Sequence, residues 1–231
     1  MNETVRAWVT GWVVSRGAAE PLAEPWGRTV DVGLPEQVTR HVLGTIGDAV
    51  DEETVRKVAG SVLGRGVWLK VFADPARVAP WLGDGWWIDP EPAYLMSARL
   101  TGRPDAGRPL PDGYRSRSWT RDGVTRVLIT AADGSFAARG QIATVGTIAV
   151  VDQIETSAGH RRLGLGSAVM RTLHRTAAER GAHTGVLGGT PDGRALYESL
   201  GWRVVAPLTS AKYTGGSGDS PADTGDAGAA A

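Results

Sequence analysis

The chain has 231 residues, of which 25 are basic and 25 acidic, so its formal net charge is zero. This balance gives no electrostatic reason for nucleic-acid binding, and no apolar run reaches the length of a membrane span. The absence of cysteine excludes disulfides, thiolate metal ligands and a cysteine nucleophile, and four scattered histidines do not favour a metal site. We therefore expect a cytoplasmic protein with no metal and with neither a membrane nor a nucleic acid as partner.

Two segments of low complexity divide the chain. Residues 102–113 are rich in proline and glycine and are predicted to be a linker, and residues 214–231 hold no large apolar side chain and are predicted to be a disordered tail. The linker separates a first half, residues 1–101, from a second half, residues 114–213.

The two halves share a weak but ordered similarity, which predicts a duplicated fold. At an offset of 116 residues the matched positions are Pro75 with Pro191, Ala79 with Ala195, Trp81 with Tyr197, Gly85 with Gly201 and Trp86 with Trp202. Seven of the nine tryptophans lie in the first 87 residues, either as core side chains or around an aromatic-lined ligand site.

The second half has the clearer local signals. Residues 147–156 are β-branched and mostly apolar, which predicts a buried strand. Residues 165–180 are predicted to form a helix, and a short glycine-rich strand follows at residues 183–189. Thr190 as a cap, Pro191 in the first turn and Gly201 at the end predict a second helix.

Residues 159–167 join the first of these strands to the first helix and carry the strongest functional signal. Gly164 and Gly166 let the backbone approach a ligand closely, and the helix start offers unpaired N–H groups and the positive end of the helix dipole. Because Arg161 and Arg162 can add charge-assisted hydrogen bonds, the loop is suited to phosphate. The loop lacks the lysine of a Walker motif, and Val169 stands where a dinucleotide fingerprint needs glycine or alanine.

Two motifs in sequence point to one family. The loop reads Arg161-Arg162-Leu163-Gly164-Leu165-Gly166, which fits the pattern Arg/Gln-x-x-Gly-x-Gly, and the second helix ends Tyr197-Glu198-Ser199-Leu200-Gly201-Trp202. The chain resembles the GNAT superfamily of acyl-CoA N-acyltransferases, well over residues 145–213 and loosely over residues 114–144. The resemblance implies a mixed α/β fold, with a central mixed sheet flanked by helices, and two such units in tandem.

The resemblance also implies acetyl-CoA as cosubstrate. The backbone that pairs with the pantetheine arm maps by position to Ile154, Glu155 and Thr156. The pyrophosphate maps to Arg161, Arg162, Leu163, Gly164, Leu165, Gly166 and Ser167. Thr190 stands where the family often has an asparagine that contacts the pantetheine, and its hydroxyl can replace one hydrogen bond.

The implied chemistry is direct attack by a primary amine on the thioester, and it requires a base and an acid. A free amine has a pKa of about 10, so a carboxylate has to take its proton. Asp152 and Glu155 are the candidates, and strand alternation predicts opposite faces, so at most one of them faces the acceptor. Either can instead be a solvated carboxylate. Tyr197 holds the family's position for the acid that protonates the CoA thiolate, with a core tyrosine as the alternative.

We interpret the first half as a degenerate unit of the same fold. At the same offset Thr45, Asp48 and Val50 stand in place of the loop's arginine and glycines, and Trp81 stands in place of Tyr197. No phosphate loop is therefore expected there. The tryptophans of this half either complete the acceptor pocket or belong to a structural lid.

The leading interpretation is an N-acetyltransferase that moves an acetyl group from acetyl-CoA to an amine, a small molecule rather than a protein, as a monomer or homodimer. A non-catalytic acyl-CoA-binding regulatory module is the alternative, and it would bind the thioester without turnover. A structural interaction protein would not bind it at all.

Overall fold

The structure is a computed structural model that describes residues 1–101 and 109–215. Most of the expected linker, residues 102–108, and most of the expected tail, residues 216–231, lie outside the described residues. Within the described ranges no helix is both long and apolar enough to cross a membrane.

Both halves alternate strands and helices. The first half contains α1 (Glu3–Arg16), β1 (Leu22–Glu24), β2 (Gly27–Leu34), β3 (Gln37–Ile46), α2 (Glu52–Gly60), β4 (Val67–Phe72), α3 (Pro75–Val78), β5 (Trp86–Ile88) and β6 (Ala93–Arg99). The second half contains β7 (Arg115–Arg121), β8 (Val124–Thr130), β9 (Phe136–Val145), β10 (Ile148–Thr156), α4 (Leu165–Glu179), β11 (Thr184–Gly189), α5 (Pro191–Ser199) and β12 (Arg203–Tyr213).

The predicted elements of the second half are confirmed within one or two residues. The apolar face of α4 is buried as predicted. Its residues in one core cluster are Leu165, Val169, Leu173 and Ala177. Thr190 caps α5 by accepting a hydrogen bond from the Gly193 N–H at 3.4 Å.

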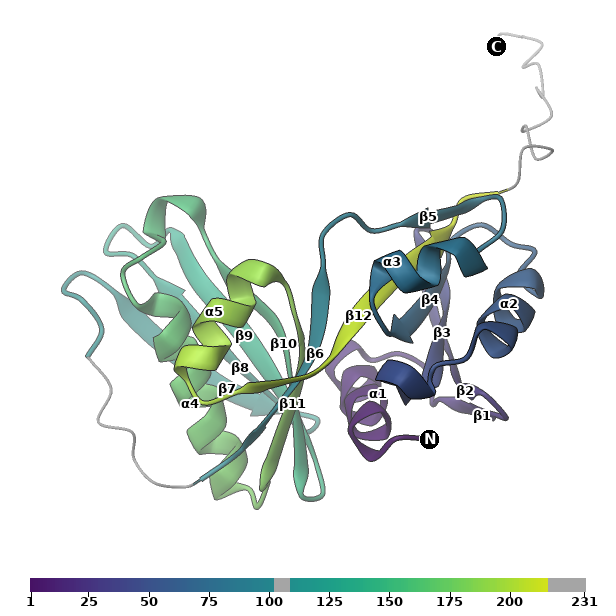
Figure 1. Cartoon of the computed structure of the whole chain (residues 1–231). Helices are drawn as coiled ribbons and strands as arrows, with labels where there is room; N and C mark the ends of the chain where they lie inside the picture. Colours follow the sequence, from purple (N-terminus) through teal and green to yellow (C-terminus); the bar gives the residue numbers. More distant parts are fainter. Residues whose placement is uncertain (102–108, 216–231) are drawn as a thin grey trace, which may run out of the picture.

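The described strands form one continuous mixed sheet. Its order is β1-β2-β3-β4-β12-β6-β11-β10-β9-β8-β7, with β5 also paired to β12. β3 pairs parallel to β4, and β10 pairs parallel to β11, while the other neighbours are antiparallel. Figure 1 shows the helices α4 and α5 on one side of the second half and α2 and α3 beside the first.

The two halves exchange their last strands. β6, from the first half, pairs with β11 of the second, and β12, from the second half, pairs with β4 of the first. β6 and β12 also pair with each other and so join the halves in the middle of the sheet, as Figure 1 shows. This arrangement is nearly symmetric, which supports the predicted duplication. The domain boundaries at residues 101 and 114 remain a prediction, since the sheet runs across both.

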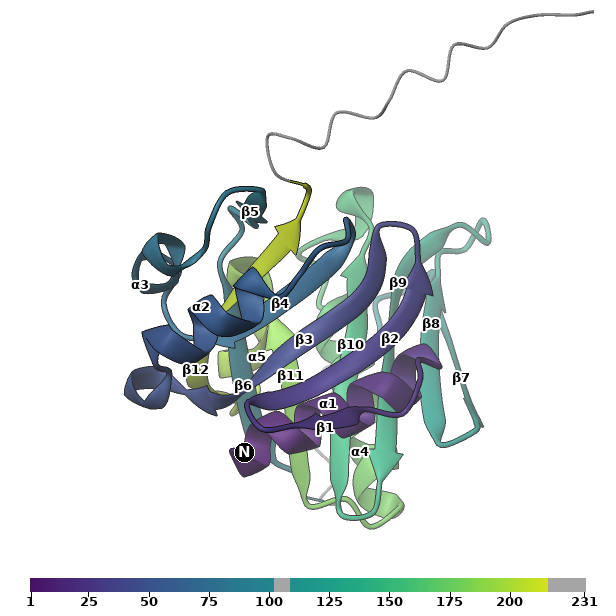
Figure 2. The ribbon, with the colours of Figure 1, turned by 90° about the vertical axis from the view of Figure 1, so that its right-hand side faces the viewer.

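The helix α1 covers the face of the second half that α4 does not cover. It packs against β9, β10 and β11, and also against β3, so it crosses the seam between the halves (Figure 2). Gly11 permits the close approach, because a Cβ there would lie 2.3 Å from Cγ2 of Val150. Trp8 and Trp12 of α1 are buried in the core between this helix and the sheet. The first half thus supplies a covering helix that the second half lacks.

Candidate functional site

The sheet opens between β10 and β11. These strands pair only from Ile148 to Val151, and beyond that point β10 stays with β9 while β11 stays with β6. A β-bulge between Asp152 and Glu155, where Gln153 has φ 55°, bends β10 at the same level. The β11 residues beside the gap are Gly188 and Gly189, which have no side chain to fill it. The end of β10 therefore has one free backbone edge.

The predicted phosphate loop lies beside this gap. Gly164, with φ 79°, ends the loop in the left-handed conformation, and no side chain caps the helix α4 that follows. The first N–H groups of α4, those of Leu165, Gly166 and Ser167, have no partner within the helix. The helix dipole adds positive potential at the same point. This geometry suits an anion.

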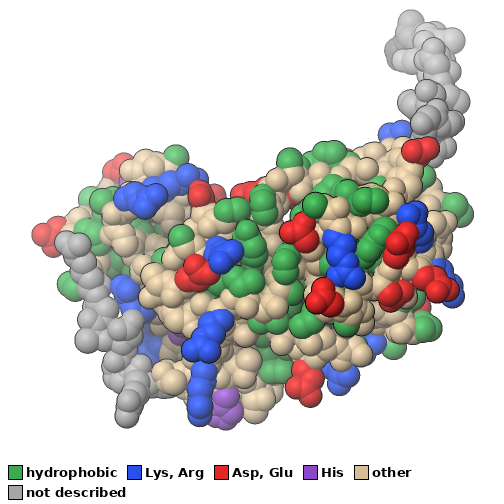
Figure 3. All heavy atoms as spheres, viewed as in Figure 1, with side chains coloured by type: hydrophobic (Ala, Val, Ile, Leu, Met, Phe, Trp, Pro, Cys, Tyr) green, Lys and Arg blue, Asp and Glu red, His purple; other side chains and the backbone are tan. Residues whose placement is uncertain are grey.

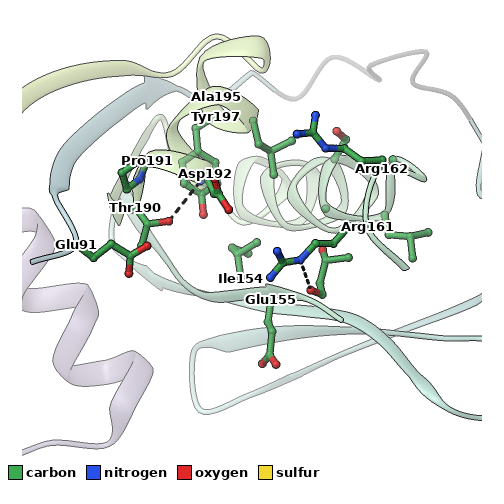
Figure 4. Close-up of a pocket in the computed structure, with 17 residues that line it drawn as sticks. Glu91, Ile154, Glu155, Arg161, Arg162, Thr190, Pro191, Asp192, Ala195 and Tyr197 are labelled. Atoms are coloured by element: carbon green, nitrogen blue, oxygen red, sulfur yellow. Dashed lines mark hydrogen bonds between the residues drawn. The ribbon is translucent and has the colours of Figure 1, made fainter. Parts of the chain in front are cut away.

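A cavity of about 710 Å³ joins the gap to the loop (Figure 4). Among the predicted site residues, those that line it are Ile154, Glu155, Thr156, Arg161, Arg162, Gly164, Leu165, Gly166, Ser167, Thr190 and Tyr197. Leu163 does not line it and is 43% exposed. Figure 3 shows that the molecule is hollowed between its two halves, with Lys or Arg and Asp or Glu side chains intermixed on this face.

Other lining residues were missed from the sequence. Besides its cap, α5 contributes Pro191, Asp192, Gly193, Ala195 and Leu196. Glu91 comes from the segment between β5 and β6, and in Figure 4 it lies beside Thr190. No local pattern marks Glu91, because only the exchange of β6 brings this segment to the second half. The tryptophans do not line the cavity.

Tyr197 is held at the inner end of the cavity. Its ring packs so closely against α5 and β11 that a Cβ at Gly189 or Gly193 would lie 2.9 Å from its Cε2. The residue is 6% exposed. Burial, and secondarily the charge of Asp152, raises the pKa of Tyr197 to about 12. At neutral pH the hydroxyl is therefore a proton donor.

The prediction that Asp152 and Glu155 face opposite sides of the sheet is wrong. Asp152 accepts hydrogen bonds from α1, from Oγ of Ser15 at 2.9 Å and from Nη2 of Arg16 at 2.9 Å. Glu155 pairs with Arg139 across β9 at 2.9 Å, and Figure 4 shows its side chain pointing away from the cavity. The bulge inserts an extra residue and resets the alternation, so both carboxylates lie on the face that α1 covers.

The histidines of the second half stabilise the structure around the site. Nδ1 of His160 lies 2.8 Å from the hydroxyl of Tyr114, the residue before β7. This contact attaches the loop to the start of β7. Nε2 of His174 accepts a hydrogen bond from the indole N–H of Trp202 at 3.1 Å, and burial lowers the pKa of His174 to about 4. In the ranges that the structure covers, no group of three or more acidic or histidine side chains is arranged to hold a metal ion.

Comparison with known proteins agrees with the loop, the gap and the sheet. The model of the GNAT acetyltransferase family matches residues 81–202. The chain belongs to the GNAT family. Members of this family are acyltransferases that use acyl-CoA. The match begins before β6, in agreement with the place of that strand in the sheet of the second half.

Solved structures extend the likeness to both halves. A GCN5-related N-acetyltransferase from Kribbella flavida has a TM-score of 0.61 and 19% identity, covering 94% of this chain and 97% of its own. A putative GNAT acetyltransferase from Novosphingobium aromaticivorans has a TM-score of 0.52 and 17% identity, covering 93% and 97%. A GCN5-related N-acetyltransferase-like protein from Streptococcus suis has a TM-score of 0.52 and 15% identity, covering 82% and 84%. No curated protein matches at the sequence level. These likenesses confirm the predicted fold class.

Proposed function

We propose that the protein is a cytoplasmic N-acetyltransferase, which transfers an acetyl group from acetyl-CoA to a primary amine carried by a small molecule. The observation that carries the proposal is the single cavity that joins the gap in the sheet, the uncapped start of α4 and Tyr197. Each of the three serves a different part of a CoA thioester, and the sequence separates them by up to 43 residues.

The loop and the helix start fit a pyrophosphate. The N–H groups of Leu165, Gly166 and Ser167 can donate to its oxygens, and Arg161 and Arg162 line the cavity beside them. A Cβ at Gly166 would lie 3.1 Å from Cδ2 of Leu196, so glycine keeps the passage between α4 and α5 open. The free backbone edge of Ile154 to Thr156 is suited to hydrogen bonds with the amides of a pantetheine arm, and an N–H there can stabilise the oxyanion of the thioester carbonyl.

Tyr197 is assigned as the general acid. When the C–S bond breaks and the new amide bond forms, the CoA sulfur leaves as a thiolate, and Oη of Tyr197 donates the proton it needs. The raised pKa keeps that proton on the hydroxyl at neutral pH. The phenolate that remains is reprotonated from solvent before the next turnover.

The acceptor amine has to enter from the face that α1 covers, because the thioester fills the opposite side of the gap. Of the two carboxylates on that face, Asp152 is the one whose charge reaches Tyr197. We assign to Asp152 the uptake of the amine proton, directly or through water, while its hydrogen bonds from Ser15 and Arg16 hold it in place. Glu155, which is half exposed and paired with Arg139, is the second candidate.

The proposal is tested by titrating the purified protein with acetyl-CoA by calorimetry and then assaying thiol release with a panel of primary amines. Micromolar binding of acetyl-CoA, and thiol release that depends on the amine, are expected. Binding without turnover on any amine would favour an acyl-CoA-binding regulatory module. No binding at all would contradict both functions.

A further inference from the structure

Two buried cations lie in the first half, on the face of the sheet that α1 covers. Arg40 of β3 and Lys70 of β4 are each only 8% exposed. The guanidinium of Arg40 stacks on the ring of Trp12 at 3.8 Å, and Nζ of Lys70 lies 4.5 Å from the ring of Trp68. Since Arg40 pairs in register with Trp68, the two cations are diagonal neighbours on adjacent strands.

Some N–H groups of these two side chains are not used in hydrogen bonds within the described part of the chain. Nζ of Lys70 donates to Oγ of Ser210 at 2.7 Å, and the other two N–H groups of Lys70 have no acceptor among the described residues. Arg40 can donate from Nε to the side-chain oxygen of Gln37 at 2.9 Å, when that amide is turned toward it. Neither cation forms an ion pair with a carboxylate in the described part of the chain. Burying charge in this way is costly unless an anion compensates it.

The position of the cations relates them to the acceptor side of the gap. The guanidinium of Arg16 lies 5.8 Å from the Trp12 ring on which Arg40 stacks, and it pairs with Asp152, whose charge acts on both Arg40 and Tyr197. The side chain of Arg16, which pairs with Asp152, is 39% exposed, so this group of charged residues extends to the surface. An amine held at Asp152 would therefore lie near two cations that form no direct ion pair with a carboxylate among the described residues.

We propose that Arg40 and Lys70 bind an anionic group of the acceptor, so that the substrate is a primary amine that also carries a carboxylate or a phosphate. This inference rests on the proposed acetyl transfer, and it names the class of amine. Arg40 offers a planar guanidinium and Lys70 a point charge, a combination that both anions accept.

Binding of an anion should favour the charged form of both side chains. Burial, and secondarily the charge of Arg40, holds the pKa of Lys70 well below its usual value, and Asp89, between β5 and β6, opposes this shift. Burial likewise lowers the pKa of Arg40 to about 9, with Arg16 lowering it further and Asp152 raising it. An anion beside Lys70 favours the ammonium form and so opposes the effect of burial on its pKa.

The experiment compares 4-aminobutyrate and 2-aminoethyl phosphate with n-butylamine as acceptors, which separates a carboxylate and a phosphate from an uncharged chain. We expect kcat/KM to be at least tenfold higher for one of the two anionic amines. The variants Lys70→Met and Arg40→Gln should lose that preference, whereas Lys57→Met, which removes an exposed lysine of α2, should keep it. Equal rates for all three amines, or a preference retained in both variants, would overturn the proposal.

A second measurement needs no acyl-CoA. Succinate and inorganic phosphate are titrated into the wild type by calorimetry, and binding is expected for the anion that matches the preferred amine. Binding that is unchanged in Lys70→Met would overturn the proposal. Transfer to n-butylamine but to neither anionic amine would contradict the anion site and leave the acetyltransferase function intact. Anion binding by a protein that does not bind acetyl-CoA would contradict only the acetyl transfer. Should Lys70→Met fail to fold, Arg40→Gln and the comparison of the three amines still decide.

Discussion

In each half of the molecule a strand is followed by a loop, a helix and a parallel strand. β3, α2 and β4 in the first half correspond to β10, α4 and β11 in the second. In the second half β10 and β11 separate after Val151, whereas in the first half β3 and β4 pair again at Ile46 and Phe72, their last residues, after an irregularity that follows Val42. The strands of the first half thus end paired, and those of the second half end apart.

The loops that follow β3 and β10 also differ, and only the loop after β10 leaves room for an anion. The loop of the first half, residues 47–51, is shorter than residues 157–164 of the second, and it ends at Asp51, whose carboxylate accepts a hydrogen bond from the N–H of Thr54 at 2.8 Å. Glu52 and Glu53 add negative charge in the first turn of α2. These side chains occupy the position that a phosphate would take. A shared topology therefore does not make a phosphate site; the cap of the helix decides.

The largest effect is expected from Tyr197→Phe, which removes only the proposed acid. We expect kcat to fall about 100-fold, or ~2.7 kcal/mol, because a positioned general acid contributes at least this much. The acetyl-CoA dissociation constant should be nearly unchanged, as measured by calorimetry. Tyr213→Phe, at the end of β12 in the sheet of the first half, is the matched control and should retain full activity. An unimpaired rate in Tyr197→Phe would remove the assignment.

Next in size is a test of the loop itself by Gly164→Val. Gly164 has φ 79°, and a β-branched residue there is strained by ~2 kcal/mol, which displaces the helix start. We expect acetyl-CoA to bind roughly 30-fold more weakly. The first half offers a matched control in Gly47→Val, where φ is 57° and no neighbour lies within 4 Å of the new Cβ. If both variants weakened binding equally, the difference between the loops would not be the cause.

Acid should destabilise the second half through His174. The folded pKa of about 4 lies below the unfolded value of about 6.5, so as the pH falls from 6.5 to 4 only the unfolded chain takes up the proton. The free energy of unfolding should drop by on the order of 2 kcal/mol over this range. In His174→Gln, which keeps an acceptor for Trp202, urea unfolding at pH 7 and pH 4.5 should show a loss smaller by that amount. The control His183→Gln changes an exposed histidine and should behave as wild type.

The smallest effect is expected from Asp51→Ala, which removes the cap of α2. The free energy of unfolding, measured with urea, should fall by about 1 kcal/mol. Acetyl-CoA affinity should stay the same, because the site lies in the other half. Binding of a second acetyl-CoA molecule by this variant would show that the cap alone had closed the first loop.

Local sequence patterns were sufficient for much of the second half. The spacing of Leu165, Val169 and Leu173 predicted a helix with one buried face, and that face packs as expected. The glycine and arginine pattern of residues 161–166 predicted an anion-binding turn, because turn conformation and helix capping depend on residues adjacent in sequence. Within that pattern only Leu163 lies away from the cavity.

The remaining features depend on contacts between distant residues. The sequence alone determined the fold class, the order of strand, loop and helix around the loop, and the place of Tyr197. Only the tertiary structure decided that β6 and β12 change partners, that the bulge turns Asp152 and Glu155 to the same face, and that Arg40 and Lys70 are diagonal neighbours on one face of the sheet. Strand pairing and bulges follow from which surfaces can be buried together, and burial of this kind leaves no signal in any short stretch of sequence.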